Sequence, residues 1–379
     1  RILSDLSENE RGVVWMQVPE SRRDEVLLDV SDLIRVALVS TIEQKTQTVS
    51  IKAFDLYEGR LRQIPISSRA DLEKSKPIWV DLVTPEEEQL EWARDIFGVD
   101  IPNPKSLTDL ETSARFYFDD DGEVHLHSNF LLDQHDQSKN ITVAFIIKGN
   151  TLFSVRNEDL PVFRLQRIRA KAQKNYVSEA KDVLLDLYAA DVEYSANALE
   201  DIYSKLESVG SQVFQSYMTN NQAAKILTAI SEEEDLNGRI RRNVLDTRNA
   251  LSFLKRGRLL SPSQHEDVRE IIRDIESLDG HTSFLFNKIN FQLDATVGFL
   301  NVNQNIDLKR LTIISVVFMP VNILAGIGGM SEFSMMTKNV PWPIAYISFV
   351  LAMIAIGAIT FFGLRAVENR KVKTGHNGK

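Results

Sequence analysis

The chain has 379 residues, of which 26% are charged, and its formal net charge is −9. This composition is typical of a large soluble protein of two or more domains. Because the chain has no cysteine, a disulfide framework and a thiolate metal site are both excluded. The first residues, "RILSDLSENERG", lack the apolar core of a secretory signal, so we expect the N-terminal part to stay in the cytosol.

Short β-rich runs alternate with helical ones over residues 1–176. The stretches "TVSIKAFDLYEG" and "IWVDLV" are typical of strands, and "ITVAFIIKGNTLFSVR" predicts a hairpin with Gly149 and Asn150 in its turn. After the second strand, we expect Thr84 to cap a helix, with Glu87 at the capping-box position. This alternation predicts a cytosolic α/β domain over 1–176.

Two histidines, His125 and His127, lie two positions apart in "EVHLHSNF" and therefore share one face of a predicted strand. Imidazoles at this spacing are able to bind zinc. The sequence nearby offers no third ligand, and such a pair is more often just an exposed strand face. Zinc binding and a simple exposed face are both open interpretations.

Residues 177–310 have the apolar spacing of long helices and predict a helical stalk. A first helix is expected over "SEAKDVLLDLYAADVEYSANALEDIYSKLESVGSQVF", a second over roughly 219–257 and a third from near Gln264. No proline occurs between Pro262 and Pro320, so we expect the third helix to continue into the apolar run that follows.

Two runs without charge follow, at 311–330 and 344–364. Each reaches the roughly 20 apolar residues that a membrane span needs, and both are too evenly apolar for core helices of a soluble protein. We predict two transmembrane helices, joined by an extracytoplasmic loop at 331–343. Basic residues at the outer ends of the pair place both chain termini, including a basic tail at 365–379, in the cytoplasm. They are Lys309, Arg310, Arg365, Arg370, Lys371 and Lys373.

Three stretches resemble the CorA-type family of divalent-cation channels, which includes magnesium transporters and the ZntB zinc transporters. "IWVDLVTPEEEQLEWARDIFGV" resembles the family's Trp-Asp-Leu entry to an acidic helix. "NTLFSVRNEDLPVFRLQRIR" is similar to its last strand and following helix, and "LTIISVVFMPVNILAGIGGM" to its pore helix. The resemblance implies an α+β fold with an α/β funnel, a long helical stalk and two C-terminal transmembrane helices. It also implies a homopentamer in which the first transmembrane helix lines the pore and the second faces lipid.

The chain departs from the family at the end of the pore helix. The family has Gly-Met-Asn there, whereas this chain has Gly329, Met330 and Ser331, followed by Glu332. The resemblance implies that these residues form the outer mouth, where the family's Asn ring holds a hydrated ion. Serine keeps an acceptor oxygen but lacks the carboxamide, which puts selectivity for Mg²⁺ in question, although not the pore itself.

Residues spaced by three or four along the pore helix form one helical stripe. If the stripe faces a five-fold axis, its polar members offer oxygens to a hydrated ion and its large apolar members narrow the path. The alternative role for Asn322 is a hydrogen bond between helices. The stripe comprises Asn305, Leu308, Leu311, Ser315, Met319, Asn322 and Gly326.

Residues 81–123 are rich in Asp and Glu, which a solvated helix face and an acidic turn largely explain. The resemblance also implies a regulatory cation site between an acid of the α/β domain and an acid on a neighbour's long helix. Counted back from the signature, the two positions of this site are occupied by Asp109 and Glu270 in this chain. The family has Asp where Glu270 stands, so the site is either shifted or lost.

These features predict a transporter of divalent cations and not an enzyme, because no nucleophile–base pair, P-loop or dinucleotide motif occurs. Mg²⁺ is the first expected cargo and regulatory ligand, with Co²⁺, Ni²⁺ and Zn²⁺ as further candidates. The alternatives are a zinc transporter of the ZntB type and a membrane-anchored sensor or scaffold without transport. The expected partners are further copies of the chain, the lipid of the inner (plasma) membrane and divalent metal ions, without nucleic acid.

Overall fold

The computed structural model describes residues 51–103, 115–120, 122–134, 137–213, 219–329, 335 and 338–376, with side chains as far as Arg365. The chain divides into two compact units. The first holds the residues up to 211 together with 228–292, and the second holds 212–227 together with 293–379. The part of the α/β prediction that falls on residues 1–50 lies outside the described residues.

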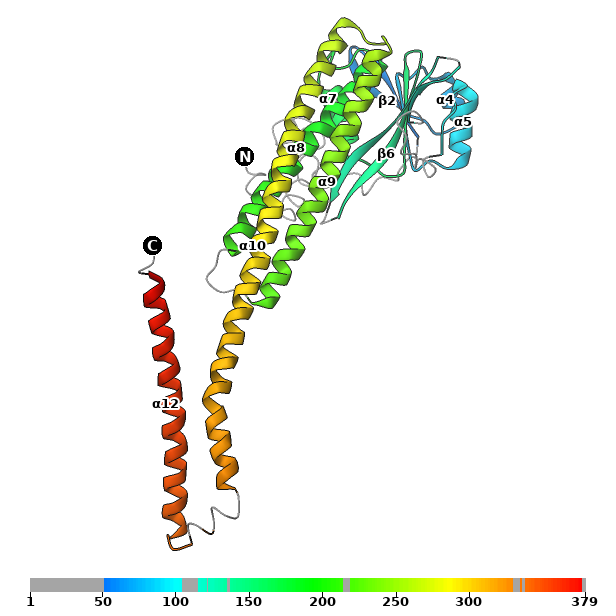
Figure 1. The fold of residues 1–379 in the computed structure, drawn as a ribbon. Coiled ribbons are helices and arrows are strands. Elements are labelled where there is room, and N and C mark those ends of the chain that lie inside the picture. The colour runs from blue at the N-terminus through cyan, green and yellow to red at the C-terminus, as the bar shows by residue number, and fades with distance from the viewer. Residues whose placement is uncertain are drawn as a thin grey trace. The chain divides into compact units, whose positions relative to one another are not determined.

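The first unit contains a mixed sheet, seven-stranded in the described part of the chain (Figure 1). Its strands are β1 (Ile51–Tyr57), β2 (Arg60–Ile64), β3 (Trp79–Val83), β4 (Phe116–Phe118), β5 (Val124–Gln134), β6 (Gln137–Lys148) and β7 (Thr151–Arg156). Their order across the sheet is β2-β1-β3-β7-β6-β5-β4. Only β3 and β7 pair in parallel, and every other neighbouring pair is antiparallel. The strands predicted around β1 and β3 are confirmed.

The predicted hairpin is also confirmed, as β6 and β7. Lys148 pairs with Thr151 at its end, and Gly149 in the turn has a φ of 59°. This left-handed backbone carries no steric penalty in glycine, which is why the chain reverses here.

The predicted start of the next helix was wrong by two residues. Helix α5 (Glu87–Phe97) has Glu86 as its N-cap, and Gln89 completes the capping box. Thr84 instead has a φ of 47°, and its hydroxyl donates to the carbonyl of Asn157 at 2.7 Å. A tertiary hydrogen bond therefore uses the side chain that the sequence pattern assigned to a local cap.

Helices cover both faces of the sheet (Figure 1). On one face, Leu90 and Ala93 of α5 pack in a core with Val80, Leu82 and Phe153. Side chains alternate between the two faces along a strand, so Trp79 points to the other face. There α7 (Pro161–Ala172) supplies Phe163, which contacts Trp79, and α8 (Ala180–Val213) supplies Tyr188, which stacks on Phe130. A short helix, α4 (Arg69–Lys74), precedes β3.

Long helices make up the rest of the described chain: α8, α9 (Asn220–Arg256), α10 (Pro262–Gly328) and α12 (Trp342–His376). A capping box starts α10, because the Ser261 hydroxyl accepts from the Gln264 amide while the Gln264 side chain accepts from the Ser261 amide. As predicted, α10 then continues without a break into the first apolar run. The predicted boundary between the stalk and the transmembrane helix, at 310/311, falls inside α10. The backbone is helical on both sides of it.

Candidate functional site

The second unit contains the apolar end of α10 and the helix α12. Both helices are long and apolar enough to cross a membrane, and neither apolar window is buried by the rest of the described chain. A core helix of a soluble protein would be mostly buried, so this exposure argues against that alternative.

One face of the apolar part of α10 packs against α12. A Cβ added at Gly328 would overlap the ring of Phe349, and one added at Gly357 would lie 3.5 Å from a methyl group of Val321. Both glycines thus allow close approach of the two helices. The partly buried residues of α10 recur at helical spacing along this face: Ile313, Val317, Pro320, Val321, Leu324 and Gly328.

The predicted stripe lies on the opposite face of α10. All seven members are exposed in the single chain, and Leu308, Leu311 and Met319 are each more than 60% exposed. At about 100° per residue, the mean direction of the stripe lies roughly 180° from the face that packs on α12. The contact with α12 therefore leaves the whole stripe available to another partner.

This exposed face carries polar groups that lipid would not accommodate well. Ser315 and Asn322 are exposed within the apolar run, and Asn305 lies just before it. Polar side chains within membrane spans commonly hydrogen-bond to other helices or face a water-filled path. At Gly326 an added Cβ would have nothing within 4 Å, so its backbone is open on this side. The face is suited to line a polar path or to meet copies of itself.

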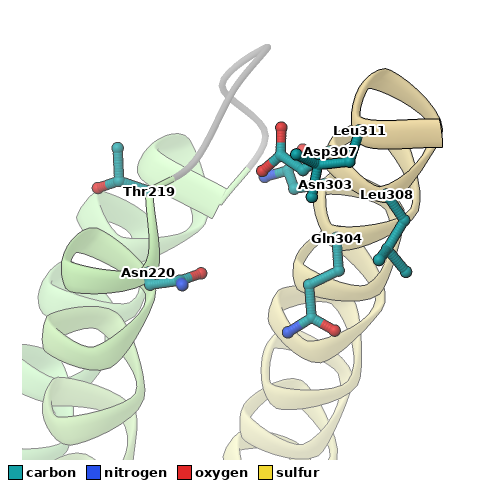
Figure 2. A pocket seen from close by; sticks show the side chains of 7 residues that line it. All are labelled: Thr219, Asn220, Asn303, Gln304, Asp307, Leu308 and Leu311. Carbon is teal, nitrogen blue, oxygen red and sulfur yellow. The ribbon is translucent and has the colours of Figure 1, made fainter. Parts of the chain in front are cut away.

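A polar pocket of about 380 Å³ opens beside the start of the stripe (Figure 2). Thr219 and Asn220 come from the beginning of α9, and five residues come from α10. Those five are Asn303, Gln304, Asp307, Leu308 and Leu311. Asp307, whose carboxylate lies 3.3 Å from the Arg310 guanidinium, is not on the stripe, so helical spacing did not single it out. Asp307 places a carboxylate within one turn of the two leucines.

The predicted outer mouth is described only at its first residue. Gly329 follows the end of α10, and its amide donates to the Ala325 carbonyl at 3.0 Å. Met330, Ser331 and Glu332 lie outside the described residues.

The predicted regulatory pair is described only in half. Glu270 is exposed on α10, whereas Asp109 lies outside the described residues. Near Glu270, burial raises the pKa of Asp267, and the carboxylates of Asp182, Glu270 and Glu266 raise it further. This end of α10 thus has a negative local potential, which attracts cations without defining a site.

The histidine pair is not an exposed strand face, as one interpretation held. His125 is 2% exposed and His127 8% exposed, both on β5. The ring of Tyr117 stacks on His125 and meets His127 edge-on. Tyr117 comes from β4, which pairs with β5 in the sheet, and sequence spacing alone does not reveal that neighbour.

These observations define a class: proteins in which a large α/β body and long helices join two apolar helices of membrane-spanning length. The family model described as "CorA-like Mg2+ transporter protein" matches residues 74–366, and the chain belongs to this family. The resemblance stated from the sequence is confirmed.

Named relatives agree with this assignment. The magnesium transport protein CorA of Yersinia pseudotuberculosis serotype I (strain IP32953) is 38% identical over 308 residues, covering 81% of this chain and 96% of that protein. The protein of the same name from Escherichia coli (strain K12) is 37% identical over 312 residues, with the same coverage. The solved CorA magnesium transporter from Methanocaldococcus jannaschii matches with a TM-score of 0.64 at 17% identity, over 84% of this chain and 98% of that one. The last comparison supports the fold alone.

Proposed function

We propose that the chain forms a homopentameric channel of the inner membrane that conducts divalent cations, with Mg²⁺ as the first cargo. Relatives named as magnesium transport proteins, 37% and 38% identical, support this cargo and favour transport over catalysis. Lys309, Arg310 and Arg365 flank the apolar segments and favour cytoplasmic termini.

The observation that carries the proposal is the exposed polar stripe of α10, opposite the face that packs on α12. One pair of apolar helices cannot enclose a water path, but several copies that turn this stripe to a common axis can. Five copies are what the resemblance implies.

In this pore, rings of Asn305, Ser315 and Asn322 offer oxygens to a hydrated ion, with the open backbone at Gly326 beyond them. Leu308, Leu311 and Met319 form apolar constrictions that gate by dewetting. Neutral oxygens suit an ion that keeps part of its water shell, because Mg²⁺ dehydrates reluctantly and carboxylate rings would hold it longer.

Two further parts of the proposal rest on the resemblance. Gly329, Met330, Ser331 and Glu332 form the outer mouth in this proposal. Asp109 and Glu270 of neighbouring chains form a regulatory site for the same class of ion.

Flux into proteoliposomes tests the proposal, with Mg²⁺, Co²⁺, Ni²⁺ and Zn²⁺ measured in parallel. We expect Mg²⁺ flux in the parent protein and its near loss in Asn322→Leu, which replaces a polar ring with an apolar one. Ser348→Ala is the matched control, because the Ser348 hydroxyl on α12 donates to the Ala345 carbonyl of its own helix. Unchanged flux in Asn322→Leu would remove Asn322 from the path.

The substitution at the signature favours a second candidate, a membrane-anchored sensor that has lost transport. Ser331 stands where the family has Asn, so the first contact with a hydrated ion is altered. No flux of any of the four ions in a correctly assembled parent protein would favour this candidate. Flux of Zn²⁺ in preference to Mg²⁺ would favour a transporter of the ZntB type.

A further inference from the structure

Three side chains with metal-binding atoms meet where β4 turns into β5, away from the proposed pore residues. Asp119 follows β4, Glu123 precedes β5, and His125 is the second residue of β5. His125 and Glu123 are 2% and 4% exposed, whereas the Asp119 side chain is 28% exposed. The group is therefore almost buried, with an opening on the side of Asp119.

One ligand atom of each side chain lies within 4.8 Å of those of the other two. His125 Nε2 lies 3.8 Å from Asp119 Oδ2 and 3.7 Å from Glu123 Oε2. The other carboxylate oxygens are engaged elsewhere. Asp119 Oδ1 accepts from the Glu123 amide at 2.7 Å, and Glu123 Oε1 pairs with Lys148 Nζ at 2.6 Å. These contacts hold one oxygen of each carboxylate, and the second oxygen of each is the one nearest the imidazole.

His125 is the second, independent indication of a ligand. Neither ring nitrogen has a hydrogen-bond partner among the described residues, although the side chain is buried. Its distances to the two carboxylates are longer than a hydrogen bond. The ring is held in place by Tyr117, stacked on it at 4.7 Å between centroids and with 3° between the planes. A buried polar group without a partner costs free energy, so something is expected to satisfy Nε2.

We propose that Asp119, Glu123 and His125 form a binding site for a transition-series divalent cation such as Zn²⁺. A cation at the centre satisfies Nε2 and is attracted by the negative charge that remains after Lys148 offsets one of the two carboxylates. Imidazole suits Zn²⁺, Co²⁺ and Ni²⁺, whereas Mg²⁺ prefers oxygen ligands alone, so this site selects against the proposed cargo.

Two of the three distances between the ligand atoms are close to those of a zinc site. Tetrahedral zinc, with bonds of about 2.0–2.1 Å, sets its ligand atoms about 3.3–3.4 Å apart. The two distances to Nε2, 3.7 and 3.8 Å, exceed this by a few tenths of an ångström. Asp119 is the most exposed of the three ligands. Three protein ligands leave a fourth position for water, which is typical of an open zinc site.

Zn²⁺ titration of the full-length protein in detergent, stripped with a chelator and kept in excess Mg²⁺, tests the site. We expect one Zn²⁺ per chain to bind in the presence of Mg²⁺, with at least tenfold weaker binding in Asp119→Asn and in His125→Asn. His127→Asn is the matched control, since His127 is also buried on β5 two residues away but is not in the group. We expect this control to bind Zn²⁺ as the parent does. X-ray absorption at the zinc edge should show one imidazole ligand in the parent.

Equal Zn²⁺ binding in the parent and in Asp119→Asn would overturn the proposal, as would a parent that binds no Zn²⁺ in excess Mg²⁺. In the second case the group would be a histidine between two carboxylates, without a metal. Asp119 is partly exposed, so its variant remains informative even if His125→Asn fails to fold. None of these readouts depends on ion transport.

Discussion

At the scale of single residues, Asp81 ties several buried groups of the sheet together. It accepts from the Ser154 hydroxyl at 2.7 Å and pairs with Arg156, and both charged side chains are 0% exposed. Arg167 of α7 reaches the same carboxylate at 3.2 Å, and the Trp79 indole donates to Ser154 at 2.9 Å. The Trp-Asp-Leu motif of the family thus has a structural reason in this chain, because its Trp and Asp belong to one buried network.

We predict that Asp81→Asn destabilises the protein by about 3–5 kcal/mol, because the buried Arg156 loses its closest counter-charge and keeps only Asp159, at 3.3 Å. Thermal or denaturant unfolding of the detergent-solubilised chain measures this change. Asp55→Asn is the control. Asp55 pairs with the exposed Arg62 on the same sheet, so its loss should have little effect. Equal effects of the two substitutions would contradict the role assigned to the buried network.

In the proposed filter, the sequence resemblance implies that Ser331 stands where the family has Asn. Ser331→Asn restores a carboxamide that reaches farther toward the water shell of a small ion. We expect the variant to favour Mg²⁺ over larger or softer cations more than the parent does, by a modest factor, since each hydrogen bond contributes about 0.5–1.5 kcal/mol. Competition flux assays measure this preference, with Ser348→Asn on α12 as the control. An identical ion preference would assign selection to Asn322 or Asn305 instead.

At the scale of elements, the pairing of α10 with α12 depends on Gly328. Gly328→Ala places a methyl group in the ring of Phe349, so we expect the two helices to separate and the assembled protein to lose thermal stability in detergent. Adding Phe349→Ala should recover part of the loss, because it vacates the space the methyl group needs. Gly363→Ala, on α12 and away from the stripe, is the matched control, since its added Cβ has nothing within 4 Å. An equal loss of stability in both glycine variants would mean that helix packing is not the cause.

The docking of α8 on β5 makes stability depend on pH through Asp191. This carboxyl accepts from the Leu131 amide at 3.1 Å and from the Asn243 side chain at 2.6 Å. Burial raises its pKa to about 7, and the nearby Asp246 adds to the rise. Since the folded state holds this proton more tightly than the unfolded state, stability is full at low pH and falls as the pH rises from about 4 to 7.

We therefore expect Asp191→Asn to flatten the decrease in unfolding temperature between pH 5 and pH 8. The introduced amide is able to donate to Asn243 Oδ1, which has no partner among the described residues, once the Asn243 amide rotates. The gain at pH 8 is at most a few kcal/mol, at roughly 1.4 kcal/mol for each pKa unit. Asp235→Asn, on the exposed face of α9, should keep the slope of the parent. An unchanged slope in Asp191→Asn would contradict this account.

At the scale of the whole molecule, the number of copies decides whether the α10 stripe encloses a path. We predict that the mass of the detergent-solubilised protein, corrected for bound detergent, corresponds to five chains of 43.0 kDa each. Native mass spectrometry or light scattering makes this measurement. A monomer or a dimer would contradict the channel, because neither surrounds an axis with the stripe.

Most of the architecture could be predicted from the sequence, because it rests on long periodic signals. The hairpin of β6 and β7, the long helices and the continuity of α10 were all visible as patterns within single segments. Features set by distant neighbours were not. Thr84 bonds to Asn157 instead of capping a helix, and His125 is covered by Tyr117 and faces Asp119 and Glu123. The exposure of the α10 stripe also required the position of α12, which periodicity alone does not give.

The parallel pairing of β3 with β7 also has a consequence for how the chain is made. This pairing joins Trp79 to Leu152, so the sheet cannot close until both strands have left the ribosome. From Arg156 to Leu311 there are 155 further positions (311 − 156), which take about 8–30 s to synthesise at about 5–20 residues per second. Sheets dominated by distant pairings fold in about milliseconds to seconds. The sheet thus has time to form before the first apolar segment is made. Exposed strand edges and exposed apolar helices, which both promote aggregation, are thereby separated in time.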